Sequence, residues 1–65
     1  MVSFNISDLY NKEELLIISK STIAEIEEKY VLGRMERINN ITGQENSPRY
    51  IAYVLQYTAN KLFNN

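Results

Sequence analysis

Each helix that this chain can form carries two stripes of apolar or aromatic side chains, and this pattern constrains the fold more than any other feature. A helix on the surface of a single core needs only one such stripe. At 100° per residue, one face of the first helical segment collects a set of mainly apolar residues: Leu15, Leu16, Ser19, Thr22, Ile23, Ile26 and Tyr30, with Ile18 at its edge. We expect this face to lie in the core.

The second stripe on the same segment repeats every seven residues, at Ile17, Ala24 and Val31, and continues through Met35 and Ile38. A seven-residue spacing with a small residue in the middle favours close approach of two helices. We therefore predict a self-association surface made of four residues: Ile17, Ala24, Val31 and Met35. The alternative is that both stripes are covered within one monomer.

Local signals indicate where the first helix begins and how far it runs. Asn11 followed by Glu14 is a capping-box pattern, which predicts a helix from about residue 11 to 41. Gly33 leaves two alternatives, because the helix either continues through it with a bend or breaks there. Rotation places Gly33 on the core face, where a missing side chain would let a neighbour approach.

The second helix has the clearest start signal in the chain. Gly43 and the polar residues after it predict a loop, and Ser47-Pro48 then supplies an N-cap and a first helical residue. The helix is predicted over residues 48–63. Its inner face is expected to hold six residues: Ile51, Val54, Leu55, Thr58, Ala59 and Leu62.

These elements predict an all-α fold in a single domain of residues 1–65, either a helical hairpin or a three-helix unit. The alternating residues 1–7 are expected to form an extended N-terminal arm. An unbroken helix over residues 12–41 would be about 45 Å long, against about 24 Å for the second, so a hairpin would leave much of it bare. We therefore expect a dimeric helical bundle, unless a break at Gly33 lets three short helices close a monomeric core.

Composition excludes several classes of function. The chain has no Cys and no His, so disulfides, thiolate or imidazole metal sites and the commonest general bases are absent. Its glutamates fall mainly on the polar side of the first helix, and no glycine-rich phosphate loop occurs. We expect no enzyme activity, cofactor or small-molecule substrate. No apolar run approaches membrane-spanning length and no signal-peptide pattern begins the sequence, so we expect a cytoplasmic protein.

The best candidate for a binding surface is a row of tyrosines on the second helix. Tyr50, Tyr53 and Tyr57 fall on one side at i, i+3 and i+7, with Arg49 before them and Lys61 extending the row. Tyrosine and arginine are enriched in binding hot spots, and tyrosine rings can also stack on bases. The alternative is intramolecular, with each ring packed on the shoulder of a bundle and its hydroxyl in water.

Nucleic acid remains a second candidate partner. Residues 34–43 and 47–51 faintly resemble a helix-turn-helix with Gly43 in the turn, although Asn39 and Arg49 stand where small and apolar residues are expected. The resemblance implies four base-reading residues: Arg49, Tyr50, Tyr53 and Gln56. The charge is polarised, with two basic and six acidic residues in 1–28 but five basic and two acidic in 29–65.

The function that we predict is binding without catalysis. The chain is expected to be a small regulator or inhibitor that docks on another protein through Arg49, Tyr50, Tyr53 and Tyr57. A DNA-binding transcriptional regulator is the alternative, and a purely structural subunit is a third possibility. A composition rich in Asn, Ile, Lys and Tyr is typical of AT-rich bacterial, phage or mobile-element genomes.

Overall fold

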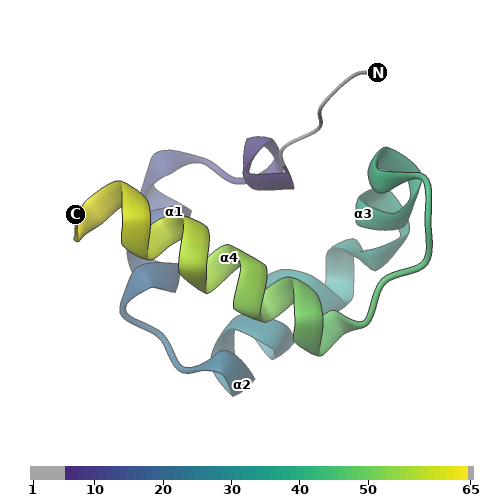
Figure 1. Cartoon of the computed structure of the whole chain (residues 1–65). Coiled ribbons are helices and arrows are strands. Elements are labelled where there is room, and N and C mark those ends of the chain that lie inside the picture. The colour runs from purple at the N-terminus through teal and green to yellow at the C-terminus, as the bar shows by residue number, and fades with distance from the viewer. Residues whose placement is uncertain (1–5, 65) are drawn as a thin grey trace.

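The computed structural model describes residues 6–64, of which 81% are helical, and no strand occurs among them. The all-α fold class is therefore confirmed. In chain order the elements are η1 (Ile6–Leu9), α1 (Lys12–Ser19), α2 (Ile23–Ile26), η2 (Glu27–Val31), η3 (Leu32–Arg34), α3 (Met35–Thr42) and α4 (Pro48–Phe63). The long helix α4 crosses one side of the molecule, and the shorter helices lie behind it and at its ends (Figure 1).

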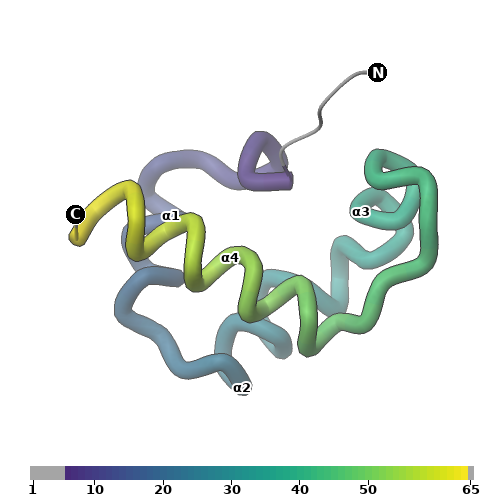
Figure 2. Tube along the Cα trace, in the orientation of Figure 1, coloured from purple at the N-terminus to yellow at the C-terminus, as the bar shows by residue number. Residues whose placement is uncertain are grey.

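The first helix begins as predicted but ends much earlier. The Asn11 side chain accepts a hydrogen bond from the Glu14 backbone N–H at 2.8 Å, and Glu14 Oε1 accepts one from the Asn11 N–H at 3.1 Å. After Ser19 the helix stops and the chain changes direction before α2 (Figure 2). The prediction of one helix over residues 11–41 is therefore wrong, because the chain breaks after Ser19. The largest extent of the molecule is 29 Å, whereas an unbroken helix over residues 12–41 would be about 45 Å long.

The break has a local cause that the spacing of apolar residues does not reveal. Thr22 and Glu25 form a second capping box, in which Thr22 Oγ1 accepts from the Glu25 N–H at 3.2 Å and Glu25 Oε1 accepts from the Thr22 N–H at 3.0 Å. Ser21 adds to the stop, because its hydroxyl donates to the Ile17 carbonyl at 2.7 Å. Threonine and serine favour such capping arrangements over a helix interior. The sequence S-T-x-x-E therefore starts a new helix instead of continuing the old one.

The segment around Gly33 is bent, as one of the two alternatives expected. A π-helical turn, η2, passes into the 3-10 turn η3, and Arg34 at its end has φ −120° and ψ 10°. Gly33 does not make room for a neighbour, however, since a Cβ placed on it would meet nothing within 4 Å. The bend instead coincides with a long-range contact, because the Tyr10 hydroxyl donates to the Tyr30 carbonyl in the π-helical turn at 2.6 Å.

Arg34, at the end of the bend, ties three segments together. Its guanidinium donates to Glu14 Oε2 at 2.8 Å and to the Leu9 carbonyl at 3.4 Å, and it lies 4.5 Å from the centroid of the Tyr10 ring. The hydrogen bond between Arg34 and Glu14 lowers the pKa of the Glu14 carboxyl and raises the pKa of the Arg34 guanidinium. Burial is the main cause that raises the pKa of the Tyr10 hydroxyl. The contacts hold η1 and the start of α1 against the bend.

Helix α4 has the predicted bounds. Gly43 ends α3 in the left-handed conformation, with φ 75°, and Asn39 Oδ1 then accepts from both the backbone N–H and the side-chain amide of Asn46 at 3.0 Å. The Ser47 hydroxyl accepts from the Tyr50 N–H at 3.4 Å, and Pro48 is the first helical residue. The loop between α3 and α4 is thus held by side-chain hydrogen bonds at both ends.

One core forms within the single chain. The largest fully buried side chains come from every α-helix, namely Ile18, Ile26, Ile38, Ile51, Leu55 and Val31. Leu16 and Leu62 were expected in the core but are exposed, whereas Ala52 is fully buried and was not expected. The break between α1 and α2 explains why Leu16 is exposed. Helix α1 is oriented independently of α2 and turns Leu15 and Ile18 toward the core.

The prediction of an extended N-terminal arm is wrong for its last two residues. Ile6 and Ser7 belong to the 3-10 helix η1 and are not extended, and Ile6 is buried in the core. The remainder of the arm predicted over residues 1–7 lies outside the described residues.

Candidate functional site

The face of α4 that points away from the core is aromatic. At 100° per residue, Tyr50, Tyr53 and Tyr57 lie within about 60° of one another, and their mean direction is about 170° from that of the buried Ile51, Leu55 and Ala59. The three tyrosines are 59%, 55% and 65% exposed, respectively. The outward face of a surface helix is ordinarily polar. The core of this chain therefore does not account for three aromatic rings at these positions.

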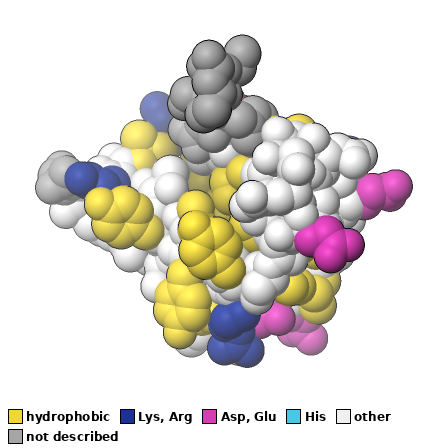
Figure 3. All heavy atoms as spheres, turned by 45° about the vertical axis from the view of Figure 1, so that its right-hand side comes forward, with side chains coloured by type: hydrophobic (Ala, Val, Ile, Leu, Met, Phe, Trp, Pro, Cys, Tyr) yellow, Lys and Arg dark blue, Asp and Glu magenta, His cyan; other side chains and the backbone are white. Residues whose placement is uncertain are grey.

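Basic side chains lie near both ends of the tyrosine row. Arg49 Nε is 2.7 Å from Glu27 Oε1, yet its side chain remains 57% exposed. Lys61 Nζ lies 5.6 Å from the centroid of the Tyr57 ring, within the range of a cation–π interaction. Figure 3 shows exposed hydrophobic side chains in a row across this side of the molecule, with Lys or Arg side chains beside its two ends.

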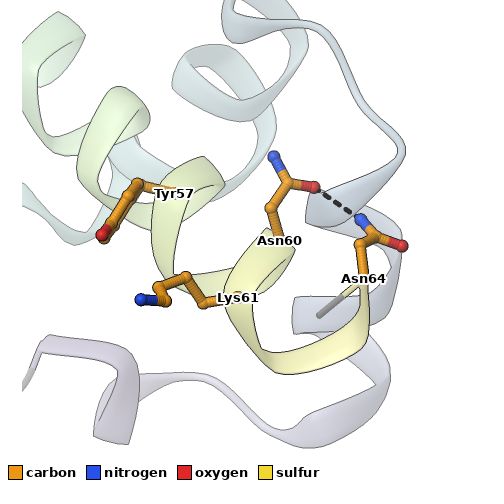
Figure 4. Close-up of a pocket in the computed structure, with 4 residues that line it drawn as sticks. All are labelled: Tyr57, Asn60, Lys61 and Asn64. Atoms are coloured by element: carbon orange, nitrogen blue, oxygen red, sulfur yellow. Dashed lines mark hydrogen bonds between the residues drawn. The ribbon is translucent and has the colours of Figure 1, made fainter.

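A shallow hollow lies at the C-terminal end of the row. It has a volume of about 320 Å³ and is lined by Tyr57, Asn60, Lys61 and Asn64 (Figure 4). Asn60 Oδ1 accepts a hydrogen bond from Asn64 Nδ2 at 2.8 Å, which fixes the orientation of the Asn60 amide. We refer to Arg49, Tyr50, Tyr53, Tyr57, Asn60 and Lys61 together as the α4 face.

Two of the four residues predicted to read DNA have partners inside the chain. Gln56 Nε2 donates to the Ser21 carbonyl at 3.1 Å, which links α4 to the α1–α2 turn, and Arg49 pairs with Glu27. Tyr50 and Tyr53 are exposed. The helix–loop–helix of α3 and α4 exists, but Gln56 is engaged in holding the fold together.

The four residues predicted for self-association do not share one surface. Ile17 is 51% exposed and Ala24 is exposed, but Val31 is fully buried and Met35 packs against the core. The heptad spacing that linked them assumed a continuous helix, and the break at residues 20–22 removes that register. Exposed Leu16 and Leu32 are further apolar surface residues that the face analysis did not predict.

The arrangement offers binding groups more than reactive ones. Within residues 6–64, no group of three or more His, Cys, Asp or Glu side chains is placed to hold a metal ion. Arg34 lowers the pKa of Glu14, and the Thr22 backbone and hydroxyl lower that of Glu25, so both carboxyls are weakened as proton acceptors. Among the described helices, none combines the length and apolar character needed to span a bilayer.

Comparison with known proteins identifies no relative of this chain. No family model, curated protein or solved structure matches the chain. Its function must therefore be argued from the α4 face itself.

Proposed function

We propose that this chain is a non-catalytic docking module that binds another protein through the α4 face and regulates or inhibits it. The observation that supports this most is the row of three exposed tyrosines on the side of α4 opposite the core. Tyrosine supplies a large contact area at a low cost in conformational entropy, and it is enriched at binding hot spots. We place this activity in the cytoplasm.

The size of the surface indicates the kind of interaction. Three half-exposed tyrosine rings present on the order of 300 Å² of surface, comparable with the largest apolar patch on many monomers. An interface centred on one 16-residue helix belongs to the small, transient class of protein contacts. We therefore expect dissociation constants on the order of micromolar.

The test is capture of partners on the immobilised full chain, compared between two variants. Tyr53→Ala removes the central ring of the row, and Leu32→Ala is a matched control because Leu32 is 53% exposed but lies in η3. Proteins retained by the wild type and by Leu32→Ala should be lost with Tyr53→Ala, while helicity and melting stay unchanged. Equal capture by all three chains would count against the α4 face.

Self-association is a second property that we propose, through a smaller surface than the sequence suggested. Ile17 and Ala24 remain exposed and Leu16 lies beside Ile17, so these residues could mediate a homodimer without disturbing the core. Sedimentation equilibrium of the wild type and of Ile17→Ser tests this. A dimer that persists unchanged in Ile17→Ser would place the contact elsewhere.

DNA binding is the alternative function, favoured by the helix–loop–helix of α3 and α4 with Gly43 in the left-handed conformation. Binding to phosphates weakens steeply as salt rises from about 50 to 200 mM, whereas docking on an apolar protein surface changes little. Titration of labelled duplex across that range distinguishes the two. Affinity for duplex that falls steeply with salt and depends on Arg49 would favour the DNA-binding regulator.

A further inference from the structure

Given the proposed docking function, we infer that the occupant of the α4 face is an acidic protein segment. The fitting segment carries apolar or aromatic residues between two carboxylate groups spaced about 18 Å apart. That spacing corresponds to the 12 residues from Arg49 to Lys61 at 1.5 Å per residue.

Helix α4 carries cations and no anions of its own. Between Pro48 and Phe63 the only charged residues are Arg49 and Lys61, and neither aspartate nor glutamate occurs. Lys61 forms no ion pair with any residue from 6 to 64, and its Nζ lies 5.6 Å from the centroid of the Tyr57 ring. Arg49 does pair with Glu27, but a solvent-exposed pair of this kind contributes little stability and can exchange partners.

The residues that line the hollow beside Lys61 carry hydrogen-bond donors. Asn60 Oδ1 accepts from Asn64, and the Asn60 Nδ2 donor has no partner among the described residues. Lys61 and Tyr57 line the same hollow (Figure 4) and bring an ammonium and a hydroxyl group. An ionised carboxylate accepts hydrogen bonds and donates none, so it matches this set of donors.

The same charges disfavour a second copy of this chain on the α4 face. In a symmetric pair each residue meets its equivalent surface, so α4 would lie against α4. An antiparallel pair would bring Arg49 of one copy to Lys61 of the other at both ends, and a parallel pair would bring like residues together. In the antiparallel pair Lys61 meets an Arg49 that Glu27 already neutralises, and in the parallel pair two unpaired Lys61 side chains meet. Neither arrangement gives Lys61 a free carboxylate, whereas an acidic segment does.

Nucleic acid is also a poorer fit than an acidic protein segment. A duplex presents a regular series of phosphates, whereas helix α4 offers only two cations. The chain as a whole carries a net charge of −1. A protein segment needs only two carboxylates, and its apolar side chains can cover the tyrosine rings between them.

Selection from a random peptide library on the immobilised full chain tests the inference. Peptides of about 16 residues span about 24 Å as a helix, enough to cover both ends of the face. Enriched sequences are then synthesised and titrated by fluorescence anisotropy against the wild type, Tyr53→Ser, Lys61→Glu and Lys12→Glu. Lys12 is the matched control, because it is an exposed lysine at the start of α1, outside the α4 face, and its reversal changes the net charge by the same amount. Thermal melts establish that all four chains are folded.

We expect the enriched peptides to carry Asp or Glu on both sides of apolar residues. Lys61→Glu should weaken their binding about fivefold and Lys12→Glu should leave it unchanged, because only Lys61 lies on the face. Tyr53→Ser should weaken binding by more than about tenfold.

The outcomes separate this inference from the proposed docking function. Peptides that require Tyr53 but show no acidic bias, or that bind Lys61→Glu as well as the wild type, overturn the acidic partner and leave docking intact. Failure to enrich any peptide that depends on Tyr53 overturns both. A homodimer abolished by Tyr53→Ser in sedimentation, or salt-sensitive binding of duplex that requires Tyr53, would assign the face to a second copy or to nucleic acid.

Discussion

At the scale of single residues, Arg34 holds distant segments of the chain together. It reaches Glu14, the Leu9 carbonyl and the Tyr10 ring, so it joins segments that are far apart in the sequence. The Glu14 carboxyl also takes part in the capping box at the start of α1. One carboxylate therefore stabilises both a helix start and a tertiary contact.

This double role predicts a pH dependence of stability. Because the folded state lowers the pKa of Glu14, chiefly through the hydrogen bond from Arg34, the unfolded chain binds more protons at acidic pH. The stabilisation is therefore present above the ordinary glutamate pKa of 4.5 and is lost as the pH falls through the lower folded-state pKa. Melting temperatures from pH 7 down to about pH 3 should decline. Glu14→Gln should melt lower at neutral pH and show a shallower decline, and an unchanged slope would contradict this assignment.

The two glycines predict opposite effects of the same substitution. Gly33 lies in a helical bend without positive φ and has open space around its Cα, so Gly33→Ala should stabilise the fold by about 0.5–1 kcal/mol. Gly43 has φ 75°, where a side chain is strained, so Gly43→Ala should destabilise it by about 1 kcal/mol. Urea denaturation measures both. Destabilisation by Gly33→Ala would show that the bend needs glycine.

At the scale of elements, capping decides the number of helices. Asn11 and Ser47 were recognised in the sequence because each precedes a strongly apolar helical segment. Thr22 was assigned to a core face by its rotation angle, and its pairing with Glu25 was overlooked. Periodicity cannot detect such a break, because apolar residues on either side of the turn still fit one helical repeat.

The cap at Thr22 can be tested directly. Thr22→Ala removes the acceptor for the Glu25 N–H and should lower the free energy of unfolding by about 1 kcal/mol. Thr22→Ser retains a hydroxyl at the same place and should lower the free energy of unfolding much less. Urea titrations monitored by circular dichroism compare the two variants. A gain in helicity with Thr22→Ala would indicate that α1 and α2 can fuse into the longer helix.

At the scale of the whole molecule, a single chain closes its own core. A compact monomer of 7.6 kDa is expected to expose about 4,300 Å², and this chain exposes 4538 Å². Val31 and Ile38, which the sequence assigned to a second stripe, are buried in that core. We therefore expect folding not to require a second copy.

This predicts that Ile17→Ser, which disrupts the proposed self-association surface, has a thermal stability independent of protein concentration. Association of folded chains raises the melting temperature with concentration by mass action even when each chain completes its own core, so the wild type is not the chain to use. Melting temperatures of Ile17→Ser measured across a hundredfold range of concentration should coincide. A melting temperature of this variant that still rises with concentration would contradict a core that one chain completes by itself.

The sequence by itself determined the all-α class, the caps at Asn11 and Ser47, the turn at Gly43 and the bounds of α4, because these depend on neighbouring residues. It also identified the tyrosine row, which requires only that α4 be a helix. Tertiary structure alone decided which apolar stripe is buried, because that depends on how α1, α2 and α3 are turned toward α4 after the chain breaks and bends. It likewise decided that Gln56 holds the α1–α2 turn while the tyrosines face outward, since no local signal specifies which side of α4 its neighbours cover.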